Sequence, residues 1–113
     1  MTVTIYHNPR CSKSRQTLEL LEENGAAPAV VEYLQAPPNA SELRDILKML
    51  GIGPRDLLRK KEAKEAGLDD PTLTDDALID AMIANPIVIE RPIVVANGKA
   101  AIGRPPESVL DIL

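Results

Sequence analysis

The chain is short, mildly acidic and poor in aromatic residues. Its 113 residues, 44% of them hydrophobic, suffice for one domain with a buried core, which must be aliphatic because there are two Tyr and neither Phe nor Trp. A formal net charge of −4 argues against nonspecific binding to nucleic acid, which depends on an excess of Lys and Arg.

Residue counts exclude several further kinds of site. One Cys and one His leave no intrachain disulfide, no thiolate cluster and no second imidazole, so we expect no metal site. No apolar run approaches the roughly 18 residues that span a bilayer, and the N-terminus opens on a strand pattern instead of a basic and apolar leader. We therefore expect a soluble cytoplasmic monomer without a membrane partner.

The first third of the chain predicts a strand, a helix and a second strand. Residues 2–6 alternate as in a strand, and the Asn-Pro pair at 8–9 then turns the backbone. The polar residues 12–14 offer caps for a helix, and residues 29–34 form the next strand. Two strands joined by a helix favour a right-handed parallel unit. The inward positions of this helix are Leu18, Leu21 and Ala26.

The middle of the chain predicts mainly helices. One helix begins after residues 37–39 and stops at Gly51, and a short helical turn follows over residues 53–59. Residues 60–67 are the most polar stretch, which we interpret as a solvated surface segment. Another helix is capped at residues 74–76. The apolar stripes are Leu43, Ile46, Leu47 and Leu50 in the first helix, and Leu78, Ile79, Met82 and Ile83 in the last.

The end of the chain predicts a hairpin and a closing amphipathic helix. Asn97-Gly98, between apolar residues 92–96 and 99–102, is the strongest short-range hairpin signal. The pattern as a whole predicts an α/β fold with a four-stranded mixed sheet, in which a helical insertion over about residues 39–84 separates the two halves of a single domain, 1–113. The closing helix carries Val109, Leu110, Ile112 and Leu113.

Cys11 lies where the first strand passes into the first helix, beside Arg10, Lys13 and Arg15. Free backbone N–H groups, the helix dipole and these cations favour the thiolate, which is the nucleophilic form. The same features attract an oxyanion, so Arg15 is also a candidate for substrate binding. The alternative is a small buried hydrophobic residue, as is usual for a free intracellular cysteine. Burial does not require three nearby cations, so we interpret Cys11 as a nucleophile.

Two arginine-proline pairs lie near the expected position of the thiol. Open α/β sheets bind ligands at the C-terminal ends of their strands, which is where Cys11 falls. Arg91 and Arg104 each precede a proline at one end of the predicted hairpin. Pro92 can be held cis to shape a backbone edge beside the thiol, the alternative being an ordinary trans proline at a strand start.

Four segments of the chain together resemble the glutaredoxin-dependent arsenate reductase family. They are YHNPRCSKSR at 6–15, LLRKKE at 57–62, ERPIVV at 90–95 and IGRPPE at 102–107, and they occur in the family's order and spacing over nearly the whole chain. The resemblance implies a thioredoxin-like fold with a helical insertion and a nucleophilic cysteine at Cys11.

The resemblance also implies the remaining site residues. It implies an arginine triad at Arg59, Arg91 and Arg104, and a cis peptide bond before Pro92. His7 and Ser14 fall on positions that adjoin the cysteine in this family and help hold its thiolate. A protonated His7 would act by its charge, whereas a neutral His7 would be a buried residue with a satisfied hydrogen bond.

The predicted activity is reduction of arsenate. A soft nucleophile must attack arsenic while the oxygens are neutralised, and the planar forks of guanidinium groups suit oxyanions. A protein with one cysteine cannot resolve its intermediate as an internal disulfide, so a thiol must come from outside. We expect an arsenate adduct on Cys11, its displacement by glutathione as co-substrate and, from the resemblance, regeneration by glutaredoxin. No tightly bound cofactor is expected.

Other classes of protein remain possible on the sequence. A glutathione-linked thiol oxidoreductase or redox sensor would use the same Cys11 on another substrate. An Spx-type transcriptional regulator that binds RNA polymerase would share the fold, but the second cysteine of its Cys-x-x-Cys switch is here Ser14. Phosphatase-type arsenate reductases place an arginine six residues after the cysteine, where this chain has Thr17, which disfavours that class.

Overall fold

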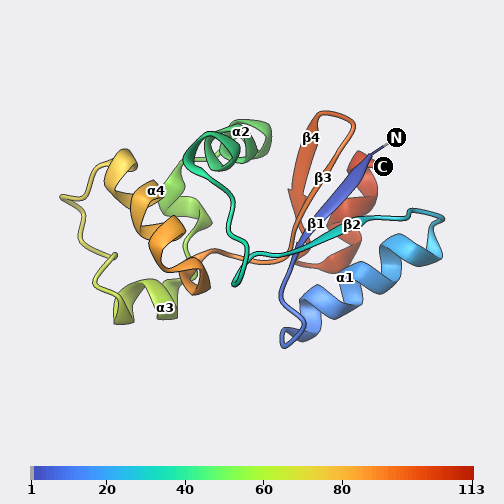
Figure 1. The fold of residues 1–113 in the computed structure, drawn as a ribbon, viewed down its shortest axis with the longest axis horizontal. Coiled ribbons are helices and arrows are strands. Elements are labelled where there is room, and N and C mark those ends of the chain that lie inside the picture. Colours follow the sequence, from blue (N-terminus) through green and yellow to red (C-terminus); the bar gives the residue numbers. More distant parts are fainter. Residues whose placement is uncertain (1) are drawn as a thin grey trace. The chain divides into compact units, whose positions relative to one another are not determined.

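Strands lie at both ends of the chain and helices fill its middle. The computed structural model describes residues 2–113 and divides the chain into two units (Figure 1). The sheet unit combines the chain up to Ala36 with Arg91–Leu113, and the helical unit is Pro37–Glu90. The helical unit contains the whole of the insertion expected over residues 39–84.

The sheet unit is built on four strands in the order β2-β1-β3-β4. Strand β1 pairs in parallel with β2 and antiparallel with β3, and β3 pairs antiparallel with β4. The predicted four-stranded mixed sheet is therefore confirmed. Its strands are β1 (Val3–His7), β2 (Ala29–Glu32), β3 (Ile93–Ala96) and β4 (Lys99–Ile102).

Helix α1 (Ser12–Glu23) and the 3₁₀ helix η3 (Pro106–Ile112) pack against each other beside the sheet (Figure 1). Leu18 packs partly buried against the core, as predicted; Ala26 also packs there, but it lies beyond the end of α1 and not within the helix. The core formed by these elements consists of Val3, Ile5, Leu21, Val94, Ala96, Val109 and Ile112. Strand β1 thus has its alternate residues buried, and the next residue in this alternation is His7.

The closing helix differs from the prediction, because it is a 3₁₀ helix over Pro106–Ile112. Its buried residues are Pro106, Val109 and Ile112, which are spaced by three, and a 3₁₀ helix has 3.0 residues per turn. Leu110, expected on the apolar face, is exposed as a result.

The helical unit consists of short helices whose ends follow local signals. Asn39 caps α2 through a reciprocal capping box with Glu42, and Gly51 ends this helix in the left-handed conformation, with φ of 71°. Helices α2 and α4 pack against each other through largely buried apolar stripes. The elements are α2 (Ala40–Leu50), η1 (Pro54–Leu57), α3 (Lys60–Glu65), α4 (Asp75–Ala84) and η2 (Pro86–Val88).

Helix α3 lies in the polar segment of residues 60–67, which is largely exposed as expected but was not predicted to be helical. Lys, Glu and Ala are strong helix formers, and a single buried residue, Ala63, anchors the helix. It ends in a Schellman motif, in which Leu68 N–H donates to Ala63 C=O at 2.8 Å and Gly67 N–H donates to Lys64 C=O at 3.1 Å. One apolar residue gives too weak a periodicity for sequence reasoning to detect.

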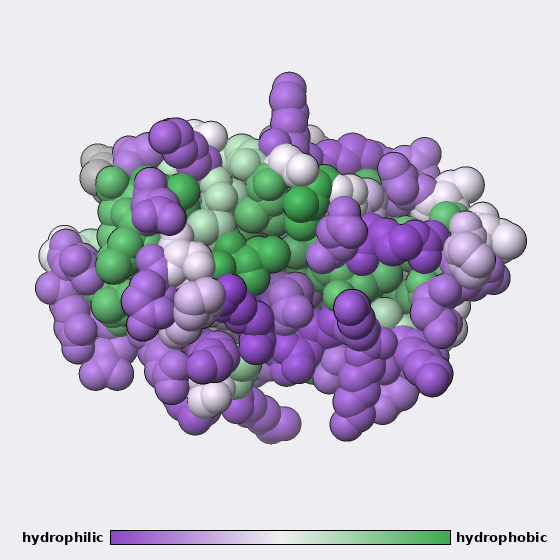
Figure 2. Space-filling view, turned by 180° about the vertical axis from the view of Figure 1, so that it is seen from behind, coloured by the Kyte–Doolittle hydropathy of each residue, from purple (hydrophilic) through white to green (hydrophobic). Residues whose placement is uncertain are grey.

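Polar residues cover most of the face seen in the space-filling view, with apolar areas showing between them (Figure 2). Of the helices formed by residues 2–113, none has the length and apolar character required to cross a membrane.

Candidate active site

A tight turn after β1 places the thiol at the start of α1. Cys11 N–H donates to Asn8 C=O at 3.0 Å, and Asn8 Oδ1 accepts a hydrogen bond of 3.0 Å from Arg10 N–H. Asparagine favours such turns because its side chain bonds the backbone two residues later. Cys11 itself becomes the N-cap residue of α1, with extended backbone angles of −92° and 123°. Its sulfur therefore lies beside the free N–H groups of the first helical turn.

The environment of Cys11 favours the thiolate. Burial raises the pKa of the Cys11 thiol and is the largest single influence on it, but several hydrogen bonds oppose burial. The backbone N–H of Ser14 and the side chain of Arg91 bond the sulfur and lower this pKa. The backbone N–H of Lys13 and the charge of Arg104 lower it further, so that the pKa lies below the ordinary value of a thiol.

The two arginine-proline pairs of the sheet unit meet at the thiol. Arg104 Nη2 lies 3.4 Å from Cys11 Sγ, and Arg104 Nε donates to Arg91 C=O at 2.7 Å. One guanidinium thus connects the sulfur to the backbone at the start of the hairpin. Both the Arg91–Pro92 and the Arg104–Pro105 peptide bonds are cis. Sequence reasoning considered a cis bond only at Pro92, since nothing distinguished Pro105 from an ordinary proline.

His7 belongs to a buried polar network beneath the thiol. His7 Nδ1 lies 2.6 Å from Ser14 Oγ, which also accepts a hydrogen bond of 3.0 Å from Asn8 N–H. Burial lowers the pKa of His7; Glu32 raises this pKa and Arg15 lowers it, and the net result is a pKa below 6.5. A neutral, hydrogen-bonded histidine therefore fits the structure better than a charged one.

The caps expected from residues 12–14 are not used as predicted. The N-cap residue of α1 is Cys11, which precedes the residues that were expected to cap it. The hydroxyl of Ser14 instead bonds His7 and the turn before the helix, while the backbone N–H of Ser14 bonds the sulfur. The physical reason is that Ser14 is fully buried and faces the strand.

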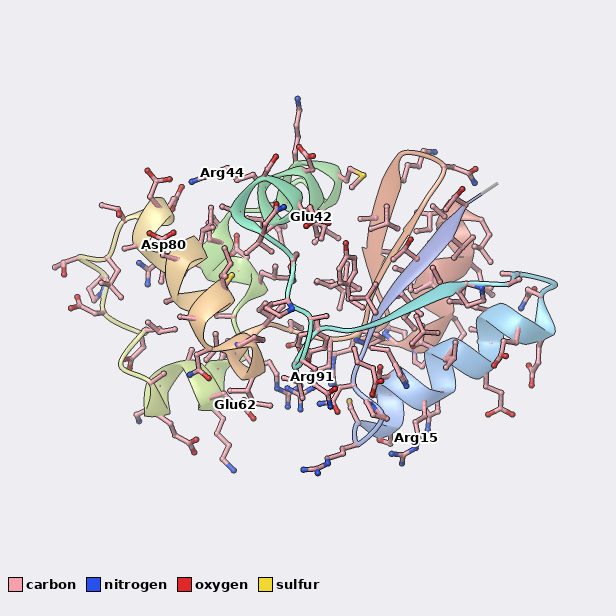
Figure 3. All side chains as sticks on the ribbon, viewed as in Figure 1. Arg15, Glu42, Arg44, Glu62, Asp80 and Arg91 are labelled. Carbon is pink, nitrogen blue, oxygen red and sulfur yellow. The ribbon has the colours of Figure 1, made fainter. Side chains whose placement is uncertain are left out.

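Arg15 is exposed at the start of α1, and Figure 3 labels its side chain. Its Nη1 donates to Pro9 C=O at 2.8 Å, so this guanidinium braces the turn that carries Cys11. Arg10 and Lys13 are also exposed, which surrounds the turn with positive charge on its solvent side.

Arg59 belongs to the helical unit, where two carboxylates hold it. Its Nε lies 3.2 Å from Glu62 Oε2 and its Nη1 lies 3.0 Å from Glu90 Oε1. Its backbone N–H donates to Val88 C=O at 2.8 Å. Sequence reasoning included Glu62 and Glu90 in the segments of the resemblance but missed that they pair with Arg59.

Thr17 occupies the position six residues after the cysteine and is fully buried in α1. Its Oγ1 donates to Lys13 C=O at 2.7 Å. This position therefore holds a threonine bonded to its own helix, where phosphatase-type arsenate reductases, the class that the sequence disfavours, have an arginine.

The arrangement in the sheet unit combines a thiolate with hydrogen-bond donors for an anion. Backbone N–H groups, two guanidiniums and the helix N-terminus all converge at Cys11. Among residues 2–113, no group of three or more His, Cys, Asp or Glu is placed to hold a metal ion. The chemistry available here is nucleophilic attack by sulfur on an electrophilic centre that carries oxyanions.

The sheet and this cysteine define a thioredoxin-like protein with a single activated thiol. The chain belongs to the ArsC family, which residues 6–112 match. Its solved neighbours include an arsenate reductase from Vibrio cholerae, 53% identical with a TM-score of 0.95 over 100% of this chain and 98% of that one. A putative arsenate reductase from Yersinia pestis is 57% identical, with a TM-score of 0.94 over 97% and 99%.

Two curated relatives span nearly the same length. An uncharacterized protein named YfgD from Escherichia coli K12 is 61% identical over 98% of this chain and 96% of its own. An arsenate reductase from Neisseria meningitidis serogroup A is 54% identical over 98% and 97%. The solved neighbours therefore confirm the thioredoxin-like fold that the resemblance implied, and the family match and the relatives confirm the family.

Proposed function

We propose that this protein is an arsenate reductase that uses the Cys11 thiolate, with glutathione as co-substrate and glutaredoxin as the regenerating partner. The observation that carries the proposal is the convergence of two guanidiniums and helix N–H groups on one acidic thiol. Relatives named as arsenate reductases, such as that of Neisseria meningitidis, support the substrate. The glutathione and glutaredoxin steps rest on the family resemblance and on the count of one cysteine.

The first step joins sulfur to arsenic. Arsenate carries between one and two negative charges at neutral pH, and the Cys11 thiolate attacks As(V) while one arsenate oxygen leaves as water after protonation. Arg91 and Arg104 offset the charge on the remaining oxygens. A guanidinium about 4 Å from a charged oxygen contributes roughly 4 kcal/mol at an effective dielectric of about 20. Arg59 is assigned to the same oxyanion by the resemblance.

The second step transfers two electrons to arsenic. The glutathione thiolate attacks Cys11 Sγ, the sulfur-arsenic bond breaks, and its electron pair stays on arsenic, which becomes As(III). Each sulfur gives up one electron and the two become a mixed disulfide. The sum is arsenate, Cys11 thiol and glutathione giving arsenite, water and the Cys11-glutathione disulfide. A glutaredoxin thiol then attacks the glutathione sulfur and releases the Cys11 thiolate.

Arsenite formation with purified protein, glutathione and glutaredoxin tests the proposal directly. When glutaredoxin is withheld, the enzyme should stall with Cys11 about 305 Da heavier, the increment of a glutathionyl group. The Cys11→Ser variant is the control and should carry no adduct. Sustained arsenate reduction by thioredoxin alone, without glutathione and without the adduct, would contradict this mechanism.

A second candidate function uses the same thiol on another substrate. The cations that lower the pKa of Cys11 equally suit the carboxylates of a glutathione-linked disulfide. A glutathione-linked oxidoreductase or redox sensor would form the mixed disulfide from oxidised glutathione but produce no arsenite from arsenate. The arsenite assay therefore separates the two candidates.

A further inference from the structure

Gly103 occupies a position where no other residue fits without movement. A Cβ atom built on Gly103 would lie 2.5 Å from Thr17 Oγ1 and 2.8 Å from Pro92 Cγ. Atoms that are not bonded repel each other at such distances, and an interior packed to the density of organic crystals leaves the neighbours little room to move away. The end of β4 therefore touches α1 and the Pro92 ring through bare backbone.

The need for glycine here comes from neighbours and not from backbone angles. Four of the six glycines adopt the left-handed conformation that favours glycine, and Gly103 is not one of them. Gly53 also lies outside this conformation, but a Cβ there would meet nothing within 4 Å. Gly103 and Gly53 thus form a natural comparison, because neither has a positive φ and only Gly103 has close neighbours where a Cβ would lie.

The surroundings of Gly103 are the groups that hold the thiol. Thr17 bonds Lys13 C=O in the first turn of α1, the turn whose N–H groups bond Cys11. Gly103 N–H donates to Pro92 C=O at 2.9 Å. The next residue, Arg104, bonds both Arg91 C=O and Cys11 Sγ.

We propose that Gly103 is a positioning residue whose missing side chain lets the end of β4 lie against Thr17 and Pro92, so that Arg104 reaches the Cys11 sulfur. A side chain at position 103 would separate β4 from α1 and withdraw the Arg104 guanidinium from the thiolate. The consequence for turnover rests on the proposed function, but the consequence for the thiol does not.

The test is the pH dependence of Cys11 alkylation by iodoacetamide, measured in the full chain. Gly103→Ala should raise the midpoint of this titration and slow alkylation at neutral pH by about threefold to tenfold, since one charge-assisted hydrogen bond to the thiolate is lost. Gly53→Ala makes the same change in open space and should leave the midpoint unchanged. A folded Gly103→Ala protein with the parental midpoint would overturn the proposal.

A second substitution separates positioning from a general loss of structure. Thr17→Ala removes both Thr17 atoms that crowd position 103, so the pair Gly103→Ala with Thr17→Ala should move the midpoint back towards the parental value. If Gly103→Ala alone does not fold by circular dichroism, the pair is measured in its place and should show at most a small rise. If the pair is also unfolded, Gly103 serves folding; if the pair is folded but its midpoint does not recover, crowding by Thr17 is not what displaces Arg104. Either result overturns the proposal. Because no arsenate enters the assay, its failure is distinct from failure of the proposed function.

Discussion

The arginines of the two units are used in different ways. In the sheet unit, Arg104 donates directly to Cys11 Sγ, and Arg91 also bonds this sulfur. In the helical unit, Arg59 lies between the carboxylates of Glu62 and Glu90. Arg91 and Arg104 lower the pKa of the nucleophilic sulfur, whereas the charge of Arg59 is offset by two carboxylates.

This difference shows that the presence of an arginine in a family motif does not by itself say what its guanidinium does; the groups that it contacts decide this. Ion pairs such as those of Arg59, with side chains about a quarter exposed, contribute about 1 kcal/mol or less to stability. Their main effect is to fix where the guanidinium points. Arg104 Nε donates instead to a backbone carbonyl, and its Nη2 lies 3.4 Å from the sulfur.

Replacing the sulfur should have the largest effect, because both arginines of the sheet unit act through it. Cys11→Ser should lower arsenate turnover by at least about 10⁴-fold, since the nucleophile is lost. The partly buried side chain keeps its size, so thermal unfolding should be nearly unchanged. Arsenite formation and circular dichroism measure the two quantities. Appreciable turnover by a folded Cys11→Ser protein would show that sulfur is not the attacking group.

Lysine substitution of the sheet-unit arginines should have the next largest effect. Arg91→Lys and Arg104→Lys keep the charge but lose the planar fork that contacts more than one acceptor. Each should lower turnover on the order of 10²-fold, as for other preorganised donors to a developing oxyanion, with little change in stability. Steady-state kinetics over a range of arsenate concentrations checks this. Parental kinetics in both variants would remove them from the oxyanion site.

Arg59→Lys sharpens the comparison between the units. Its charge is already offset by Glu62 and Glu90, so we expect a loss in turnover of about tenfold, smaller than for the other two arginines. Glu90→Gln is a matched control that removes one ion pair and keeps the guanidinium. If Arg59→Lys were as damaging as Arg104→Lys, the distinction between the two units would be wrong.

The smallest effect should be a pH dependence of stability from His7. The pKa of His7 is lowered in the folded protein, so below pH 6.5 the unfolded chain binds more protons. The contribution of His7 to the free energy of unfolding is complete above pH 6.5 and is lost as the pH falls through the lowered pKa. The slope of the free energy of unfolding against pH should stay below about 1.4 kcal/mol per pH unit, the limit for one proton. Urea unfolding of the parent and of His7→Gln between pH 5 and 8 measures it. An identical slope in the variant would assign the effect to other groups.

Local signals explain why much of the sheet unit was predictable. The hairpin follows from Asn97-Gly98, whose positive φ values of 57° and 72° are those of a turn that few other residues adopt. The parallel pairing of β1 with β2 follows from the strand-helix-strand pattern. The sequence also indicated that Arg91 and Arg104 lie near Cys11. Arg91 lies just before the first strand of the predicted hairpin and Arg104 just after its second strand, at the sheet end expected to hold Cys11.

Features that depend on distant partners were not predictable. Glu90 lies 31 residues from Arg59, and no periodicity in the sequence reveals that they pair. The requirement for glycine at position 103 arises from Thr17 and Pro92, which are remote in the chain. Nor did composition show that Ser14 would bond His7 instead of capping α1, because that choice depends on burial against the strand.

The long separation between the thiol and its arginine has a consequence for synthesis of the chain. Cys11 and Arg104 are 93 residues apart, and the helical unit, Pro37–Glu90, is one continuous segment between them. Chains fold from the N-terminus as they leave the ribosome, so the helical unit is complete while β3 and β4 have yet to be made. Arg91 and Arg104, which lower the pKa of the Cys11 thiol, are therefore the last part of its surroundings to be made. We therefore expect the full lowering of this pKa, and with it the full reactivity of the sulfur, only after residues 91–104 have joined the sheet.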